Sequence, residues 1–225
     1  MNTRTQVSPR SRLSRTLNPR KFPSQGRAES TVEAILQAAA HILAGEGWEA
    51  VNTNRVAVEA GVSIGSLYQY FPGRDAILAE LGRRHAFQIV EATRTALETT
   101  QDLPLLEAVR ETIRAAIRLH EIDPALHRAL EDETPSLGPL DWRAAADVQT
   151  HQIIWQSLAL RSEEMGVQDF ELLAFLAATI VEGVVHASMS ARPDDLKNGQ
   201  IEMELIETVM FVFTRARGSS RISSS

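Results

Sequence analysis

A glycine-centred turn between two short helical segments constrains the fold of this chain more than any other feature of the sequence. Residues 52–71 read NTNRVAVEAGVSIGSLYQYF. We expect Thr53 to cap a first short helix, because a side-chain oxygen there can accept a hydrogen bond from an amide of the first turn. Gly61 ends this helix, since glycine adopts a positive φ angle without steric cost. Ser63 is then placed to cap a second helix over 64–70.

Small and apolar residues are spaced so that these two helices pack on each other. They are Val56, Ala60, Val62 and Leu67. This packing leaves the start of the second helix, 64–66, and its outer residues Tyr68 and Gln69 facing away from the core. A free helix of this width fits the major groove of DNA, so the segment is a candidate helix-turn-helix. An ordinary helical corner is the alternative, but a corner does not require exposed polar and aromatic residues on one short helix.

The residues before this segment predict another helix. Ser30 and Glu33 match a capping box, in which each side chain accepts a hydrogen bond from the other residue's amide. Apolar residues then recur with helical spacing at positions 32, 35, 36, 39, 42 and 43. Gly45 and Gly47 end this helix. Together with the two short helices it forms a predicted three-helix domain.

The rest of the chain shows helical periodicity and little sign of β-strands. A long helix is expected from about Asp75 to Leu97, and proline and glycine breaks separate those that follow. These later helices are expected near 104–122, 124–132, 141–164, 168–191 and 199–216. The predicted fold class is therefore all-α, with an N-terminal three-helix helix-turn-helix domain followed by a larger helical domain. The expected parts are a flexible basic arm over 1–28, a DNA-binding domain over 29–75, the larger domain over 76–217 and a disordered tail over 218–225.

Charge is distributed unevenly along the chain. Residues 1–28 carry seven basic side chains and no acid, whereas residues 29–225 carry 16 basic and 29 acidic side chains. A basic arm on an acidic body points to a polyanionic partner for the arm. The absence of cysteine excludes disulfides, and with no secretory signal recognised the expected location is cytoplasmic. The longest apolar run, near 172–181, is too short to span a bilayer, so no membrane partner is expected.

Residues 53–78 combine several spacings that agree with one family at once. They are Thr53, Val56-Ala57, Ala60-Gly61-Val62-Ser63, Gly65-Ser66-Leu67-Tyr68, Tyr70-Phe71, Arg74 and Leu78. This combination resembles the TetR family of one-component transcriptional repressors. Lysine is usual in the family at the position of Arg74, and arginine preserves its positive charge.

The resemblance implies a role for each matching position. Thr53, Tyr68, Tyr70 and Arg74 would contact DNA phosphates, with Asn54 and Arg55 as further candidates. The rest of the implied DNA-binding surface is Ser63, Ile64, Gly65, Ser66 and Gln69. Within it, Gln69 can pair with adenine and Ile64 can meet a thymine methyl group.

The predicted DNA-binding domain is not itself basic. Residues 29–81 hold two basic and seven acidic side chains. Because neutralisation of phosphates supplies much of the affinity for DNA, we expect the arm to provide it. Arg20, Lys21 and Arg27 would lie along phosphates or enter the flanking minor groove. The alternative is a solvated tail with no specific role.

The resemblance also implies that the larger domain binds an effector and forms a dimer. Helix 168–191 is apolar nearly all round, so it must be buried on two sides, and helix 199–216 adds a further apolar face. The implied homodimer interface uses these two helices; a core formed within one chain is the alternative. Candidate contacts for a small, largely apolar effector are Phe87, Trp142, His151, Gln152, Trp155 and Glu182.

The predicted function is a sequence-specific regulator that binds a palindromic operator as a homodimer and is released from it by a small ligand. The alternatives are a regulator of the same fold that activates or ignores ligands, and an all-helical enzyme or scaffold. No catalytic constellation favours an enzyme, and no cofactor is expected. A metal site is not predicted at His120, Glu121, His127 and Glu131, because Asp123-Pro124 breaks the helix between the histidines.

Overall fold

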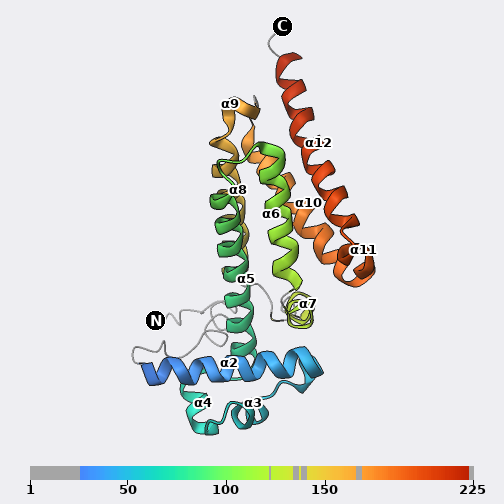
Figure 1. Ribbon diagram of the computed structural model, residues 1–225. Helices are drawn as coiled ribbons and strands as arrows, with labels where there is room; N and C mark the ends of the chain where they lie inside the picture. Colours follow the sequence, from blue (N-terminus) through green and yellow to red (C-terminus); the bar gives the residue numbers. More distant parts are fainter. Residues whose placement is uncertain (1–25, 122, 134–136, 138–140, 166–168, 223–225) are drawn as a thin grey trace, which may run out of the picture. The chain divides into compact units, whose positions relative to one another are not determined.

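The computed structural model describes residues 26–121, 123–133, 137, 141–165 and 169–222, which are helical and contain no strand (Figure 1). This confirms the all-α fold class. The chain divides into two compact units. The first unit comprises Met1–His85 with Ala125–Trp142, and the second comprises Ala86–Pro124 with Arg143–Ser225.

The first helix of the first unit is α2, Gly26–Glu46. It begins before Ser30, so the expected capping box is wrong. The carboxylate of Glu33 has other donors: the Arg84 guanidinium, with Nη1 2.6 Å from Oε2, and the Gln37 amide at 3.3 Å. These contacts tie α2 to a residue more than fifty positions away, which local capping rules do not anticipate.

A short 3-10 helix, η1 (Trp48–Ala50), leads into α3 (Thr53–Glu59) and α4 (Ile64–Tyr70). Figure 1 shows α2 lying across both short helices. The N-cap of α3 is Asn52 rather than Thr53, with Asn52 Oδ1 accepting a hydrogen bond from the Arg55 amide at 3.0 Å. Asparagine one position earlier is an equally good cap, and it leaves the threonine as the first helical residue.

The next long helix, α5 (Arg74–Thr99), contributes residues to both units. In the first unit its residues Ile77 and Leu78 are fully buried beside Ile35 of α2. A second helix, α7 (Pro124–Glu133), adds the buried Leu130 to the same apolar cluster.

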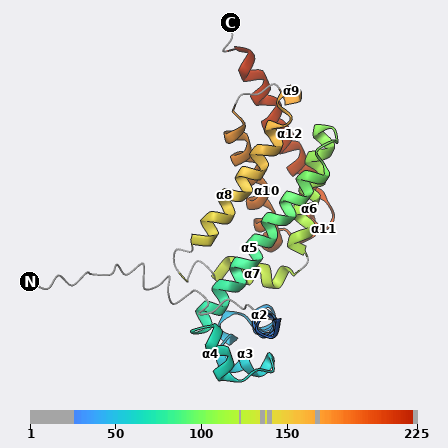
Figure 2. The same cartoon turned by 90° about the vertical axis from the view of Figure 1, so that its left-hand side faces the viewer.

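The second unit holds the remaining helices. They are α6 (Leu105–Glu121), α8 (Asp141–Ala159, from Arg143 on), α9 (Ser162–Met165), α10 (Phe170–Ala191), α11 (Pro193–Lys197) and α12 (Gln200–Ile222). Helices α6, α10 and α12 pack against one another (Figures 1 and 2). Their shared core includes Ile117, Leu173, Val185, Leu205 and Phe213.

Three elements of the second unit differ from their expected bounds. The helix expected over 141–164 is broken at Leu160–Arg161 into α8 and α9. Residues 193–197, expected as a loop, form the short helix α11, because Pro193 suits the first position of a helix. Helix α12 continues to Ile222, beyond its expected end at 216.

Helix α10 is long and apolar enough to cross a membrane by length and composition, with a mean hydropathy of 1.8. The apolar run 172–181 is shorter than a bilayer requires, but the helix that contains it has 22 residues. Core helices of soluble proteins have the same composition, so this feature alone is weak evidence for a membrane segment. The packing of α10 against α6, α11 and α12 fits a core helix.

A buried carboxylate stabilises the contact between α2 and α5. Glu80 is 5% exposed and accepts hydrogen bonds from Arg83 at 2.7 and 2.8 Å and from Arg84 at 3.0 Å. Burial by itself would raise the pKa of Glu80, but the hydrogen bonds and positive charges of the two arginines outweigh it and hold the pKa below its ordinary value. Arg84 also contacts Glu33, so the network joins the two helices.

We expect Glu80→Gln to lower the free energy of unfolding at neutral pH by about 1–3 kcal/mol, because the arginines lose a charged acceptor. Since the folded-state pKa is depressed, this contribution is present above the ordinary carboxyl pKa and is lost as pH falls through the folded-state pKa. Urea unfolding of both proteins at neutral and acidic pH measures the effect. The difference between them should shrink in acid; a difference that stays constant with pH would contradict an ionic contribution.

Candidate nucleic-acid interface

The turn between α3 and α4 fixes how the two helices meet. Gly61 has a φ angle of 65°, which a residue with a side chain rarely adopts, and this confirms its expected role. After the turn, the Val62 amide donates to the Ala57 carbonyl at 3.0 Å. Val56 of α3 and Leu67 of α4 are both 0% exposed, as the spacing predicts. The inner face of α4 is therefore held against the core.

The N-terminus of α4 is capped as expected. Ser63 Oγ accepts a hydrogen bond from the Ser66 amide at 3.0 Å and lies 2.8 Å from Ser66 Oγ. The two hydroxyls thus order the first turn of α4, where base-contacting residues of a recognition helix lie. If either serine hydroxyl contacts DNA, it does so while it also takes part in the helix cap.

The outer face of α4 is accessible. Ile64 is 38% exposed and Tyr68 42% exposed, and Gly65 and Gln69 are also exposed. Tyr70 differs from them, because it is partly buried and packs against the apolar core of the first unit. The accessible face therefore carries an aliphatic side chain, an amide and a phenol, which suit contacts with a thymine methyl group, a base edge and a phosphate respectively.

A hydroxyl pair joins the two short helices on this side of the first unit. Thr53 Oγ1 of α3 lies 3.1 Å from the Tyr68 hydroxyl of α4. The pair exists because Asn52 caps α3 and leaves the threonine side chain available. Two hydroxyls held this close can present one donor proton to an incoming phosphate oxygen while remaining bonded to each other.

Both basic side chains between residues 29 and 81 are engaged by carboxylates. Arg55 forms a two-pronged ion pair with Glu46, one contact of which is 2.8 Å. The hydrogen bond from Arg55 lowers the pKa of Glu46, and the glutamate in turn raises the pKa of the arginine. To bind a DNA phosphate, Arg55 must therefore leave the Glu46 carboxylate.

Arg74 is held in a similar way at the start of α5. Its Nε lies 3.4 Å from Asp75 Oδ1, its Nη1 lies 3.9 Å from Glu49, and its guanidinium carbon is 5.8 Å from the centroid of the Trp48 ring. Sequence reasoning did not identify these partners. A single stretch of the chain, 46–49, supplies one carboxylate to each arginine. The two glutamates that flank Trp48 in the sequence were the available signal.

Other predicted contacts lie outside this face or outside the described residues. Asn54 is exposed on α3. The arm residues Arg20 and Lys21 lie outside the described residues, and Arg27 falls in the first turn of α2. The sequence analysis did not single out Val58 as a surface residue, although this valine is 82% exposed on α3.

The candidate effector residues are not gathered at one place that the structure defines. Five of them belong to the second unit and Trp142 to the first. Within the second unit Phe87 is partly buried, whereas Gln152, Trp155 and Glu182 are exposed. His151 packs beside Phe175, with ring centroids 5.7 Å apart. None of these residues lines the pocket described next.

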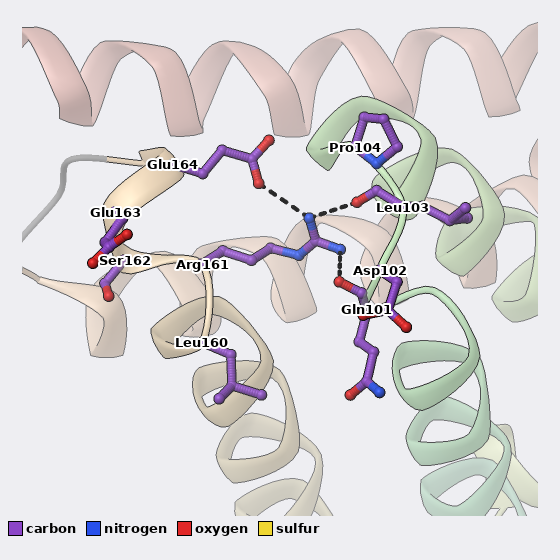
Figure 3. Close-up of a pocket in the computed structure, with 9 residues that line it drawn as sticks. All are labelled: Gln101, Asp102, Leu103, Pro104, Leu160, Arg161, Ser162, Glu163 and Glu164. Atoms are coloured by element: carbon purple, nitrogen blue, oxygen red, sulfur yellow. Dashed lines mark hydrogen bonds and ion pairs between the residues drawn. The ribbon is translucent and has the colours of Figure 1, made fainter.

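A surface pocket of about 740 Å³ lies between the α5–α6 connection and the α8–α9 turn (Figure 3). Arg161, whose side chain is 10% exposed, extends into it and donates to the carbonyls of Thr100, Gln101 and Leu103 at 2.8–2.9 Å. Glu164 accepts a further bond at 3.2 Å. The Arg161 guanidinium thus satisfies three carbonyls of the connection that follows α5 and holds this connection against the α8–α9 turn. The same contacts explain the break between α8 and α9.

Two family models match the chain. One, described as bacterial regulatory proteins of the tetR family, matches residues 35–81, which include α3 and α4. The other, described as a tetracyclin repressor-like C-terminal domain, matches residues 104–210. Together they account for more than half of the chain. No curated protein sequence matches it.

Solved structures show the same fold. A protein of Mesorhizobium loti assigned to the TetR family is 16% identical, with 84% of this chain and 98% of that chain covered and a TM-score of 0.68. SmeT, the repressor of the Stenotrophomonas maltophilia multidrug efflux pump SmeDEF, is 19% identical, with coverages of 82% and 91% and a TM-score of 0.61. The fatty acid degradation regulator FadR of Bacillus halodurans is 16% identical, with coverages of 83% and 96% and a TM-score of 0.61.

The family assignment carries three general properties. Its members are regulators of transcription rather than enzymes, they bind DNA, and they form homodimers. The helix-turn-helix found in the sequence and the accessible face of α4 agree with the first family model, and the helical second unit agrees with the other. This chain belongs to the TetR family of transcriptional regulators.

Proposed function

We propose that this regulator is a repressor that binds a palindromic operator as a homodimer through α4 and leaves it when a small, largely apolar ligand binds. The observation that carries the proposal is the accessible outer face of α4 on a helix whose inner face is fully buried. A repressor of this kind acts where the bacterial genome is, so we place it in the cytoplasm.

A single α4 is too short to supply strong and specific binding alone. Two copies related by a two-fold axis read two half-sites about 34–36 Å apart, or a multiple of that spacing, which doubles the contacts. In each copy Ile64 and Gln69 would contact base edges. Thr53 and Tyr68 would position the helix on phosphates, and the basic arm would add the charge that the acidic first unit lacks.

The proposed dimer surface lies on α10 and α12 of the second unit. Large apolar side chains are exposed there: Leu172 (51%), Phe175 (50%), Val184 (37%), Met203 (60%) and Phe211 (62%). Both helices also contribute to the core of their own unit. A helix with a buried face and an exposed apolar face fits an interface between two copies.

Ligand release requires that the ligand bind the DNA-free conformation more tightly than the DNA-bound one. The proposed route is α5, one continuous helix whose residues belong to both units. A ligand that packs among the apolar helices of the second unit would bias α5, and through it the spacing of the two α4 helices. SmeT is described as a repressor and FadR as a regulator of fatty acid degradation, which is consistent with an apolar effector class.

A gel-shift experiment with the DNA upstream of this protein's own gene tests the proposal. We expect a specific complex that weakens when cell extract or long-chain apolar compounds are added. In a separate assay, a reporter gene placed behind the same upstream DNA should be expressed more strongly in a strain that lacks this protein. A specific complex that no extract weakens would contradict ligand release, and lower expression in the deletion strain would indicate an activator. The absence of any complex at low ionic strength would overturn DNA recognition through α4.

Contacts made by α4 predict a defined loss of affinity. Gln69→Ala and Tyr68→Phe should each weaken operator binding by about 1–3 kcal/mol, the first by losing a base contact and the second by losing a phosphate donor. Fluorescence anisotropy with labelled operator measures both. Gln37→Ala, an exposed glutamine on α2, is the matched control and should bind normally. Equal loss in the control would show that the effect is not local to α4.

The basic arm predicts a change in salt dependence. Deleting residues 1–25 removes six basic side chains and leaves α2 intact. If Arg20 and Lys21 each neutralise one phosphate, the slope of log affinity against log salt should fall in magnitude by about 1.8 per subunit. The full-length double variant Arg20→Gln/Lys21→Gln separates charge from chain length. An unchanged slope in both proteins would exclude the arm as a phosphate ligand.

The exposed apolar face predicts how the dimer can be weakened. Phe211→Glu places a charge on the α12 face and should destabilise the dimer by about 2 kcal/mol or more, roughly a 30-fold rise in the dissociation constant. Sedimentation velocity over a concentration series measures it. Leu160→Glu, at an apolar position 79% exposed beside α8, is the control. A dimer that tolerates Phe211→Glu and dissociates with Leu160→Glu would place the interface elsewhere.

A further inference from the structure

Two histidines from distant parts of the second unit face each other inside it. His120, in the last turn of α6, is 5% exposed, and His186 of α10 is partly buried. Their Nε2 atoms are 3.0 Å apart and their ring centroids 4.9 Å apart. Three neighbours along the two helices belong to the apolar core: Ile117 of α6, and Val185 and Met189 of α10. The two imidazoles thus meet at the edge of a low-polarity environment.

The backbone fixes which nitrogen of His120 is available. His120 Nδ1 lies 2.6 Å from the Ala116 carbonyl oxygen. A carbonyl oxygen can accept a hydrogen bond but cannot donate one, so Nδ1 carries the proton. In the neutral ring, Nε2 therefore presents a lone pair toward His186. Histidines that ligate metals are oriented in this way, with the other ring nitrogen donating to a backbone carbonyl or a carboxylate.

We propose that His120 and His186 are two ligands of a binding site for a divalent transition-metal ion of the Zn²⁺ class. Zinc–nitrogen bonds are about 2.0–2.1 Å long, which places two nitrogen ligands of a tetrahedral ion roughly 3.3 Å apart. The two Nε2 atoms need to separate by only a few tenths of an ångström to reach that spacing. Water completes the set.

Without metal, the His186 Nε2 proton lies between the two nitrogens as an N–H···N hydrogen bond. When a metal binds, that proton moves to Nδ1 of His186, and both Nε2 lone pairs face the ion. Imidazole nitrogen favours Zn²⁺, Ni²⁺ and Cu²⁺ over Mg²⁺ or Ca²⁺, which sets the expected selectivity.

Isothermal titration of the tag-free, EDTA-treated full-length protein with ZnCl₂ tests the site without operator DNA, so its outcome is independent of the proposed function. We expect one Zn²⁺ per chain, and Co²⁺ should give the visible absorption of a low-symmetry, nitrogen-ligated ion. His186→Gln should weaken binding at least tenfold, as should His120→Ala. MgCl₂ should give no comparable heat.

His151→Gln is the matched control, because His151 is also partly buried in the second unit but lies beside Phe175. Thermal melts followed by circular dichroism establish that each variant is folded. If His120→Ala does not fold, His186→Gln alone decides the matter. Zinc binding that survives His186→Gln in a folded protein, or that is lost equally in His151→Gln, would overturn the proposal. A second facing pair in the first unit, His85 and His127 with Nε2 and Nδ1 2.6 Å apart, supplies the competing location; loss of binding only in His85→Ala would also overturn it.

Discussion

The packing of α3 on α4 around one glycine turn is the constraint on which the rest of this regulator depends. Val56 and Leu67 are completely buried, and Gly61 supplies the positive φ angle that lets the chain reverse within three residues. Because Leu67 holds one side of a seven-residue helix in the core, the opposite side must face solvent. The accessible positions 64, 65, 68 and 69 follow from that burial.

Electrostatics distinguishes this chain from a simple basic DNA-binding domain. Arg55 and Arg74 are the two basic residues between 29 and 81, and both form ion pairs with carboxylates of the first unit. Hydroxyl groups, an amide and a helix N-terminus remain as local donors, and each neutral contact is weaker than a charged one. Affinity must then come from doubling the surface in a dimer and from charges elsewhere in the chain. The proposed source of such charges is the set of seven basic residues in 1–28.

The parts that sequence predicted correctly are those governed by local rules. Helical periodicity and the cap at Ser63 depend on residues within one or two turns, and both agree with the structure. Two of the errors arose where a distant residue competes. Ser30 and Glu33 satisfy the capping-box pattern, but Arg84 takes the glutamate and α2 starts earlier. A continuous helix over 141–164 satisfies periodicity, but Arg161 turns to bind carbonyls at the end of α5 and breaks it.

The histidine pair shows the same limit in the second unit. Read along the chain, His120 and His127 suggest a local pair, and the break at Pro124 argues against a metal site there. The contact that sequence did not predict joins His120 to His186, 66 positions later, and the packing of α6 against α10 brings these two rings together. Burial then makes the pair informative: an imidazole that is 5% exposed and has its Nδ1 fixed by a backbone carbonyl cannot turn its Nε2 to water, so that nitrogen must meet either a proton or a cation.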